Sequence, residues 1–204
     1  FGNSLLLSTL QAYYEGKKDL FEGLAMASLE KDWKTYPVLL LDLNARRYED
    51  VHSLVAILNQ HLESWEAVYG DEKKDRAPEE RFAYLIEKIC RETSQKVVVL
   101  IDEYDKPMLQ AIHNKELQTS YRNILKAFYG VLKSKDAYLQ FALLTGVTKF
   151  SKVSVFSDLN NLMDISMDNR YAAISGITEQ QPLTDLAEYI RDLSETLQMS
   201  YEDL

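Results

Sequence analysis

Cysteine is almost absent from this chain of 204 residues, which contains only Cys90. A single cysteine excludes a disulfide within the chain, and the sequence is therefore compatible with a reducing cytosol. No apolar run reaches the roughly 18 residues that a membrane-spanning helix needs. The chain opens on Phe1 without the charged and apolar pattern of a signal peptide. We therefore expect a cytoplasmic protein that does not associate with membranes.

Basic charge is also scarce, since 23 lysines and arginines stand against 32 aspartates and glutamates and give a net charge of −9. Binding to duplex DNA or RNA needs a basic face, which this balance does not supply. The basic residues fall in short clusters flanked by acids, such as "EGKKDL", "NARRYED" and "DEKKDR". Such mixed runs are typical of solvated loops. We therefore expect no direct nucleic-acid binding by these residues.

The hydrophobic share of 46% is sufficient for one globular domain with a substantial core. The first residue is not methionine, and the last residues, "QMSYEDL", still follow a helical pattern. We therefore expect both ends to be cuts within a longer protein.

Short apolar runs alternate with apolar residues at helical spacing. The runs predict strands at Val38 to Leu41, at Val97 to Ile101 and in the stretch "AYLQFALLTG" at 137–146. Helical spacing is found at 5–14, 51–65, 82–89, 117–132 and 183–197. Continuously apolar strands between helices indicate a parallel α/β sheet that is buried on both faces. The stretches "NLMDISMD" and "YAAISGIT" predict two shorter extended pieces.

The most apolar predicted strand runs directly into acidic residues, in "VVVLIDEYDKP". Parallel sheets bind their ligands at the carboxyl ends of the strands, where Asp102 and Glu103 are expected to lie. A metal-dependent phosphoryl-transfer site needs this arrangement. Asp102 would hold magnesium, directly or through water, and Glu103 would orient and activate the attacking water. The alternative is that both are solvated acids at a strand end.

Two further stretches fit the same chemistry. The chain begins "FGNSLLLSTL", in which Gly2 and Ser4 precede an amphipathic helix. A phosphate-binding loop ends in this way, because backbone N–H groups at a helix start stabilise phosphate charge. Ser4 would complete the magnesium shell with Asp102, although a serine N-cap explains it equally well. In "FALLTGVTKF", Thr145 ends a strand where a γ-phosphate or the attacking water could be sensed.

The stretches "FGNSLLLSTLQAYYEGKKDLFEGL", "VVVLIDEYDKPML" and "LLTGVTKFSKVSVFSDLNNLMDIS" together resemble the AAA-ATPase-like family of bacterial P-loop proteins. In that family a PD-(D/E)XK nuclease-like domain often follows. The resemblance implies the α/β P-loop NTPase fold, a three-layer α/β/α arrangement with a mainly parallel sheet. It also implies an ATPase-like domain at 1–177, truncated before the strand that leads into the phosphate loop. Residues 178–204 would begin a following helical region.

The resemblance also implies roles for individual residues. Gly2, Asn3 and Ser4 match the end of the phosphate loop, which binds ATP. For the other site residues, Asp102 matches the acid that holds Mg²⁺, Glu103 the catalytic glutamate, and Thr145 the polar sensor. Tyr104, Asp105 and Lys106 belong to the family signature without an assigned role, except that Asp105 could cap the next helix. The implied partners are ATP and a downstream nuclease-like domain, and a homo-oligomer is compatible with them.

Asn3 departs from the family pattern, because many members have lysine there. Asparagine donates hydrogen bonds but does not neutralise phosphate charge. Two functions therefore stay open: an ATP-binding and ATP-hydrolysing domain that regulates a downstream domain, or a degenerate scaffold or interaction module without ATPase activity. Nuclease activity of this chain is disfavoured, since "IDEYDK" lacks the separated acid and (D/E)-x-K strand of such enzymes. The missing strand is expected to leave a gap between the other strands of the sheet.

Overall fold

The structure, a computed structural model, describes residues 2–44, 46–147, 155–156 and 159–174. The chain divides into two compact units. The larger comprises Leu7–Met163, and the smaller combines residues 1–6 with the chain from residue 164. The larger unit contains all three strands and the long helices of the described residues.

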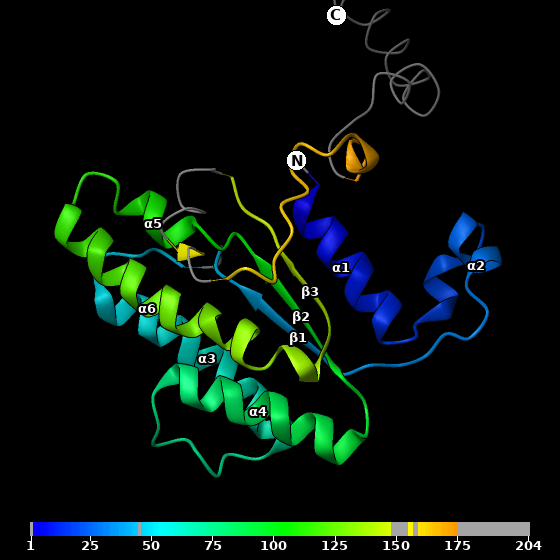
Figure 1. Ribbon diagram of the computed structural model, residues 1–204, viewed down its shortest axis with the longest axis horizontal. Coiled ribbons are helices and arrows are strands. Elements are labelled where there is room, and N and C mark those ends of the chain that lie inside the picture. The colour runs from blue at the N-terminus through cyan, green and yellow to red at the C-terminus, as the bar shows by residue number, and fades with distance from the viewer. Residues whose placement is uncertain (1, 45, 148–154, 157–158, 175–204) are drawn as a thin grey trace, which may run out of the picture. The chain divides into compact units, whose positions relative to one another are not determined.

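The sheet of the larger unit has three parallel strands in the order β1-β2-β3 (Figure 1). Their bounds are β1 Val38–Asp42, β2 Val97–Asp102 and β3 Leu139–Leu144. The register places Asp42 opposite Asp102, and Ile101 opposite Leu144. All three strands therefore end at one edge of the sheet, and the predicted parallel α/β sheet is confirmed.

The central strand β2 is buried along its whole length. Its side chains alternate between two apolar clusters, because successive side chains of a strand point to opposite faces. Val97, Val99 and Ile101 belong to the larger cluster, while Val98 and Leu100 pack in a smaller one with Leu7. Burial of each such side chain contributes about 1.5–3 kcal/mol, which explains why this strand is continuously apolar.

Helices cover both faces of the sheet. The part of α1 from Leu7 onward packs on one face, in the smaller cluster. Three long helices cover the other face and contribute to the larger cluster, in which Phe82 and Phe128 stack with their ring centres 4.6 Å apart. The bounds of these four helices are α1 Asn3–Tyr14, α3 Val51–Tyr69, α4 Pro78–Thr93 and α6 Lys115–Ser134.

Local sequence explains where the long helices begin. The side chain of Asp50 accepts a hydrogen bond from the Ser53 N–H and caps α3. Asn114 caps α6 in the same way, and Pro78 is the first residue of α4, where no donor is needed. The shorter elements are η1 Lys18–Phe21, α2 Ala25–Leu29, α5 Lys106–Gln110, η2 Asp136–Tyr138 and η3 Asn169–Tyr171. Among the described residues, none of the helices has the length and apolar character needed to cross a membrane.

Among the described residues, the three strands pair without a gap, because β2 bonds directly to both neighbours. The gap expected where the phosphate-loop strand is missing stays a prediction, but the first predicted extended piece is wrong. Residues 161–168 form turns and irregular backbone instead of an extended piece. The Asp164 and Asp168 side chains accept hydrogen bonds from the backbone two residues ahead, a pattern that favours turns over strand pairing.

The second predicted extended piece, at 171–178, is described only as far as residue 174. Residues 171–174 form the end of η3 and turns, so this part of the prediction is wrong. The domain boundary after residue 177 and the helical region at 178–204 lie outside the described residues.

Candidate active site

Each strand ends in a polar residue, or is directly followed by one, on the same face of the sheet. On the face covered by α1, the apolar side chains form three rows: Val38 and Leu40 in β1, Val98 and Leu100 in β2, and Phe141 and Leu143 in β3. Because side chains two residues apart share a face, the next members of these rows are Asp42, Asp102 and Thr145. The carboxyl edge of this face is therefore polar, directly beyond an apolar surface.

The structure brings Asp102 and Thr145 together. The Thr145 hydroxyl donates a hydrogen bond to Oδ1 of Asp102 at 2.6 Å. The Thr145 N–H donates to the carbonyl of Ile101 at 2.9 Å, which continues the pairing of β2 and β3 past the end of the strand. Asp102 is only 5% exposed, and a buried carboxylate needs such donors. The sensor and metal-binding roles of these residues stay predictions.

Glu103 occupies a sharp turn immediately after β2. Its backbone has a φ of +53°, in the left-handed region that side chains other than glycine rarely adopt. The turn closes with a hydrogen bond from the Lys106 N–H to the Glu103 carbonyl at 2.9 Å. Partial burial and then the charges of Asp102 and Asp105 raise the pKa of the Glu103 carboxyl above its ordinary value. A more basic carboxylate in a strained turn suits a general base.

Asp105 does not cap the helix that follows it, and that interpretation is wrong. It stands at the N-cap position of α5, but its side chain makes no capping bond. Its carboxylate instead accepts from the Val147 N–H, in the loop after β3. The prediction failed because the partner comes from a distant loop.

Gly2 directly precedes α1 and Asn3 and Ser4 begin it, and all three belong to the smaller unit. Gly2 has a φ of +88°, which explains the glycine. The carbonyl of Gly2 accepts the first helical hydrogen bond, from the Leu6 N–H at 2.9 Å. Gly2 therefore takes the cap position, and the alternative of Ser4 as N-cap is wrong. Because each unit is described by itself, a meeting of Ser4 with Asp102 stays a prediction.

The predicted site omitted Asp42, which lies at the same edge. Its Oδ1 accepts from the Asn44 N–H at 2.7 Å, and its carbonyl oxygen is 3.1 Å from Nε2 of the half-buried His61. The signal was present in the sequence, since the run "VLLLD" ends in an acid as "VVVLID" does. The register of β1 and β2 places the two aspartates, Asp42 and Asp102, opposite each other on adjacent strands.

The donor chemistry at this edge fits Mg²⁺. Magnesium prefers oxygen ligands, keeps several waters and takes one or two carboxylates in addition to substrate phosphates. Within the described ranges, no group of three or more histidines, cysteines, aspartates and glutamates is arranged to hold a metal by itself. A site that relies on a single carboxylate together with phosphate oxygens is compatible with that finding.

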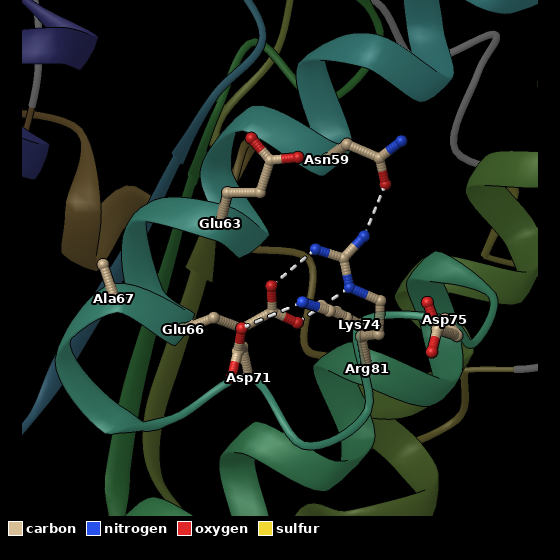
Figure 2. A pocket seen from close by; sticks show the side chains of 8 residues that line it. All are labelled: Asn59, Glu63, Glu66, Ala67, Asp71, Lys74, Asp75 and Arg81. Carbon is tan, nitrogen blue, oxygen red and sulfur yellow. Dashed lines mark hydrogen bonds and ion pairs between the residues drawn. The ribbon is translucent and has the colours of Figure 1, made fainter.

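A separate cavity of about 490 Å³ lies between the end of α3 and the start of α4 (Figure 2). There Arg81 donates to both carboxylate oxygens of Glu66, at 2.7 and 2.6 Å, and to Oδ1 of Asn59 at 2.7 Å. Arg81 and Glu66 are both buried, so this ion pair joins the two helices. None of the predicted site residues lines the cavity.

Comparison with known proteins places the chain in a family. The family described as a predicted AAA-ATPase matches residues 1–156. A relative from Azotobacter chroococcum mcd 1, described as an uncharacterized protein in the vnfD 5′ region, is 41% identical over 180 residues. The match covers 88% of this chain and 35% of the relative, so the chain spans about a third of the length of that curated protein. No solved structure matches the chain.

Proposed function

Because the chain belongs to the family of predicted AAA-ATPases, we propose that it has the P-loop fold and binds and hydrolyses Mg·ATP at the carboxyl edge of its sheet. Family membership itself suggests nucleotide binding. The observation that carries the proposal is the hydrogen bond between Thr145 and Asp102, which joins the carboxyl ends of two adjacent strands. Glu103 directly follows Asp102 in the sequence. These are the groups that a phosphoryl-transfer site needs beside the phosphates.

The direction of α1 supports phosphate binding by Gly2, Asn3 and Ser4. Within the larger unit, the Tyr14 carbonyl accepts from the Tyr36 N–H at 2.7 Å, at the amino end of β1. From Leu7 to Tyr14 the helix therefore runs against the strands, and its amino-terminal direction is toward their carboxyl edge (Figure 1). The amino end of a helix stabilises anions through unpaired N–H groups and the helix dipole.

In this proposal, Ser4 and Asp102 would hold Mg²⁺, and Glu103 would take a proton from the attacking water. Bound Mg²⁺ would supply charge neutralisation of the ATP phosphates. The raised pKa of Glu103 supports the role of a base, because it increases the affinity of the carboxylate for that proton. Thr145 donates a hydrogen bond to the Asp102 carboxylate, and in this proposal it would respond to the γ-phosphate.

A second candidate function is a nucleotide-binding scaffold or interaction module without ATPase activity. The observation that favours it is Asn3, which lacks the positive charge of the lysine that many members carry. Control of a downstream nuclease-like domain stays a prediction from the resemblance, since the matched family description concerns only the ATPase.

The first test is calorimetry of Mg·ATP binding with the full-length protein. Binding should require magnesium and should be lost in Asp102→Ala. Turnover should then be lost in Glu103→Gln with binding retained, while Glu22→Gln makes the same change on an exposed side chain and should leave both unchanged. Unchanged turnover in Glu103→Gln would contradict its role as the base. ATPase activity that arises only in Asn3→Lys would favour the scaffold.

A further inference from the structure

We propose that Asp105 is a positioning residue, which holds the loop after β3 on the turn after β2 and thereby sets the relative position of Thr145 and Glu103. The expected effect on catalysis rests on the proposed ATPase function, whereas the contacts of Asp105 do not depend on that function. Asp105 belongs to the signature "IDEYDKP" but had no role in the predicted chemistry.

The first link is the carboxylate of Asp105. This side chain is 0% exposed, yet it carries an ionisable group into the interior. The Val147 N–H donates to its two oxygens, at 3.2 Å and 3.1 Å, from a residue 42 positions later in the sequence. Burying a carboxylate is costly unless donors compensate for the lost water. The site therefore favours the arrangement in which the loop of Val147 stays docked.

The second link consists of a backbone hydrogen bond between the turn and the loop, and of the close approach that Gly146 permits because it has no side chain. The Tyr104 N–H donates to the Thr145 carbonyl at 2.9 Å. Between Thr145 and Val147, Gly146 lies against the turn so closely that a Cβ would stand 2.4 Å from Cε1 of Tyr104 and 2.7 Å from Oδ1 of Asp105. A residue other than glycine would therefore require the loop, the buried Tyr104 ring or the Asp105 carboxylate to shift.

The turn is itself fixed from the core. The Tyr129 hydroxyl of α6 donates to the Tyr104 carbonyl at 3.0 Å. The ring of Phe156 lies 4.8 Å from the Tyr104 ring and 5.6 Å from the Tyr129 ring, measured between centres. Tyr104 therefore connects the buried face of α6 to the turn residues on either side of it, Glu103 and Asp105.

These contacts form one clamp, consisting of Tyr104, Asp105, Gly146 and Val147. The two predicted catalytic residues flank it, since Glu103 precedes Tyr104 and Thr145 precedes Gly146. A displaced loop would disturb the 2.6 Å bond between Thr145 and Asp102 while the phosphate-loop residues stay unchanged in sequence. Loosening the clamp should therefore slow the chemical step more than it weakens nucleotide binding, because misplacement by about 1 Å can cost roughly 100-fold in rate.

The test compares Asp105→Asn and Gly146→Ala with the control Gly130→Ala in the full-length protein. Asparagine keeps the shape of Asp105 but removes its charge and one acceptor. Gly146→Ala adds a Cβ against Tyr104 and Asp105 from the side of the loop, and it changes no acidic residue in the sequence. Gly130 is the matched control, because nothing lies within 4 Å of a Cβ added there. Each protein is assayed for ATP turnover, for Mg·ATP affinity by calorimetry and for hydrogen exchange at the Tyr104 and Val147 amides.

We expect turnover to fall at least about tenfold in both clamp variants while the dissociation constant for Mg·ATP changes less than about threefold. Amide exchange at Tyr104 and Val147 should quicken by about tenfold or more in both variants and stay unchanged in Gly130→Ala. Normal turnover in the folded fraction of both clamp variants would overturn the positioning role, even if their melting temperatures fall. Should the unsubstituted protein hydrolyse no ATP, the proposed function fails. The exchange measurement then decides the clamp alone, and unchanged exchange refutes it.

Discussion

Replacing Glu103 should make the protein more stable, because two features of this residue oppose folding. Its backbone is left-handed, with a φ of +53°. Its carboxyl pKa is raised by partial burial and by the neighbouring acids, so the folded state disfavours the ionised form. Both features are explicable if the residue is retained for catalysis, since active sites often keep strained or destabilised groups.

The backbone contribution can be estimated. A left-handed conformation costs a residue other than glycine roughly 1–2 kcal/mol. Glycine costs about 0.5–1 kcal/mol more than alanine in lost chain entropy on folding. Glu103→Gly should therefore gain about 0.5–1 kcal/mol from the backbone, or about 1–4 °C in melting temperature for a chain of this size. Ser94→Gly, at a φ of +55°, should give the same gain without loss of ATP turnover.

Glu103→Gln isolates the effect of charge. A folded-state pKa above the ordinary value means that stability falls as the pH rises through the ordinary value toward the raised one. Below the ordinary pKa both states are protonated, so the variant and the unsubstituted protein should differ little at about pH 4. At about pH 8 the variant should be the more stable. Urea unfolding at both pH values measures this, and a pH-independent difference would refute the electrostatic reasoning.

Thr145→Val removes the hydroxyl that donates to Asp102, and should lower the free energy of unfolding by about 1.5–3 kcal/mol together with ATP turnover. Thr145→Ser keeps the donor and should retain most of both; a valine variant as active as the unsubstituted protein would exclude the sensor role. Arg81→Met should cost about 3–5 kcal/mol in urea unfolding, because Glu66 is left buried without its partner. Combining it with Glu66→Leu should recover most of that loss, and an additive double variant would contradict this account.

The sheet was largely predictable because its strands are short apolar runs between helices, and the central strand β2 is buried on both faces. The runs Val38 to Leu41 and Val97 to Ile101 match β1 and β2 to within one residue at the carboxyl end. The third run was predicted too long, since β3 ends at Leu144 and the preceding Asp136–Tyr138 form a 3₁₀ turn. The prediction of an extended piece at 161–168 failed, because aspartate side chains there accept hydrogen bonds from nearby backbone and compete with strand pairing.

The candidate site was predictable only where strand ends define it. Asp102 and Thr145 could be expected near each other, because both end strands of a parallel sheet. The bond between Asp105 and Val147 could not, since it joins two loops whose approach is decided by packing around Tyr104. A local rule assigned Asp105 to a helix cap, and tertiary structure gave its carboxylate a different partner.

The pairing of β2 with β3 also has a consequence for synthesis of the chain on the ribosome. Thr145 follows Asp102 by 43 residues, so the carboxylate emerges long before its hydroxyl donor. At about 5–20 residues per second, that interval lasts roughly 2–9 seconds. During it the end of β2 cannot be buried without cost, because its acid lacks this hydrogen bond. The nascent chain is thus expected to keep this edge open to solvent, and to chaperones, until β3 has been made.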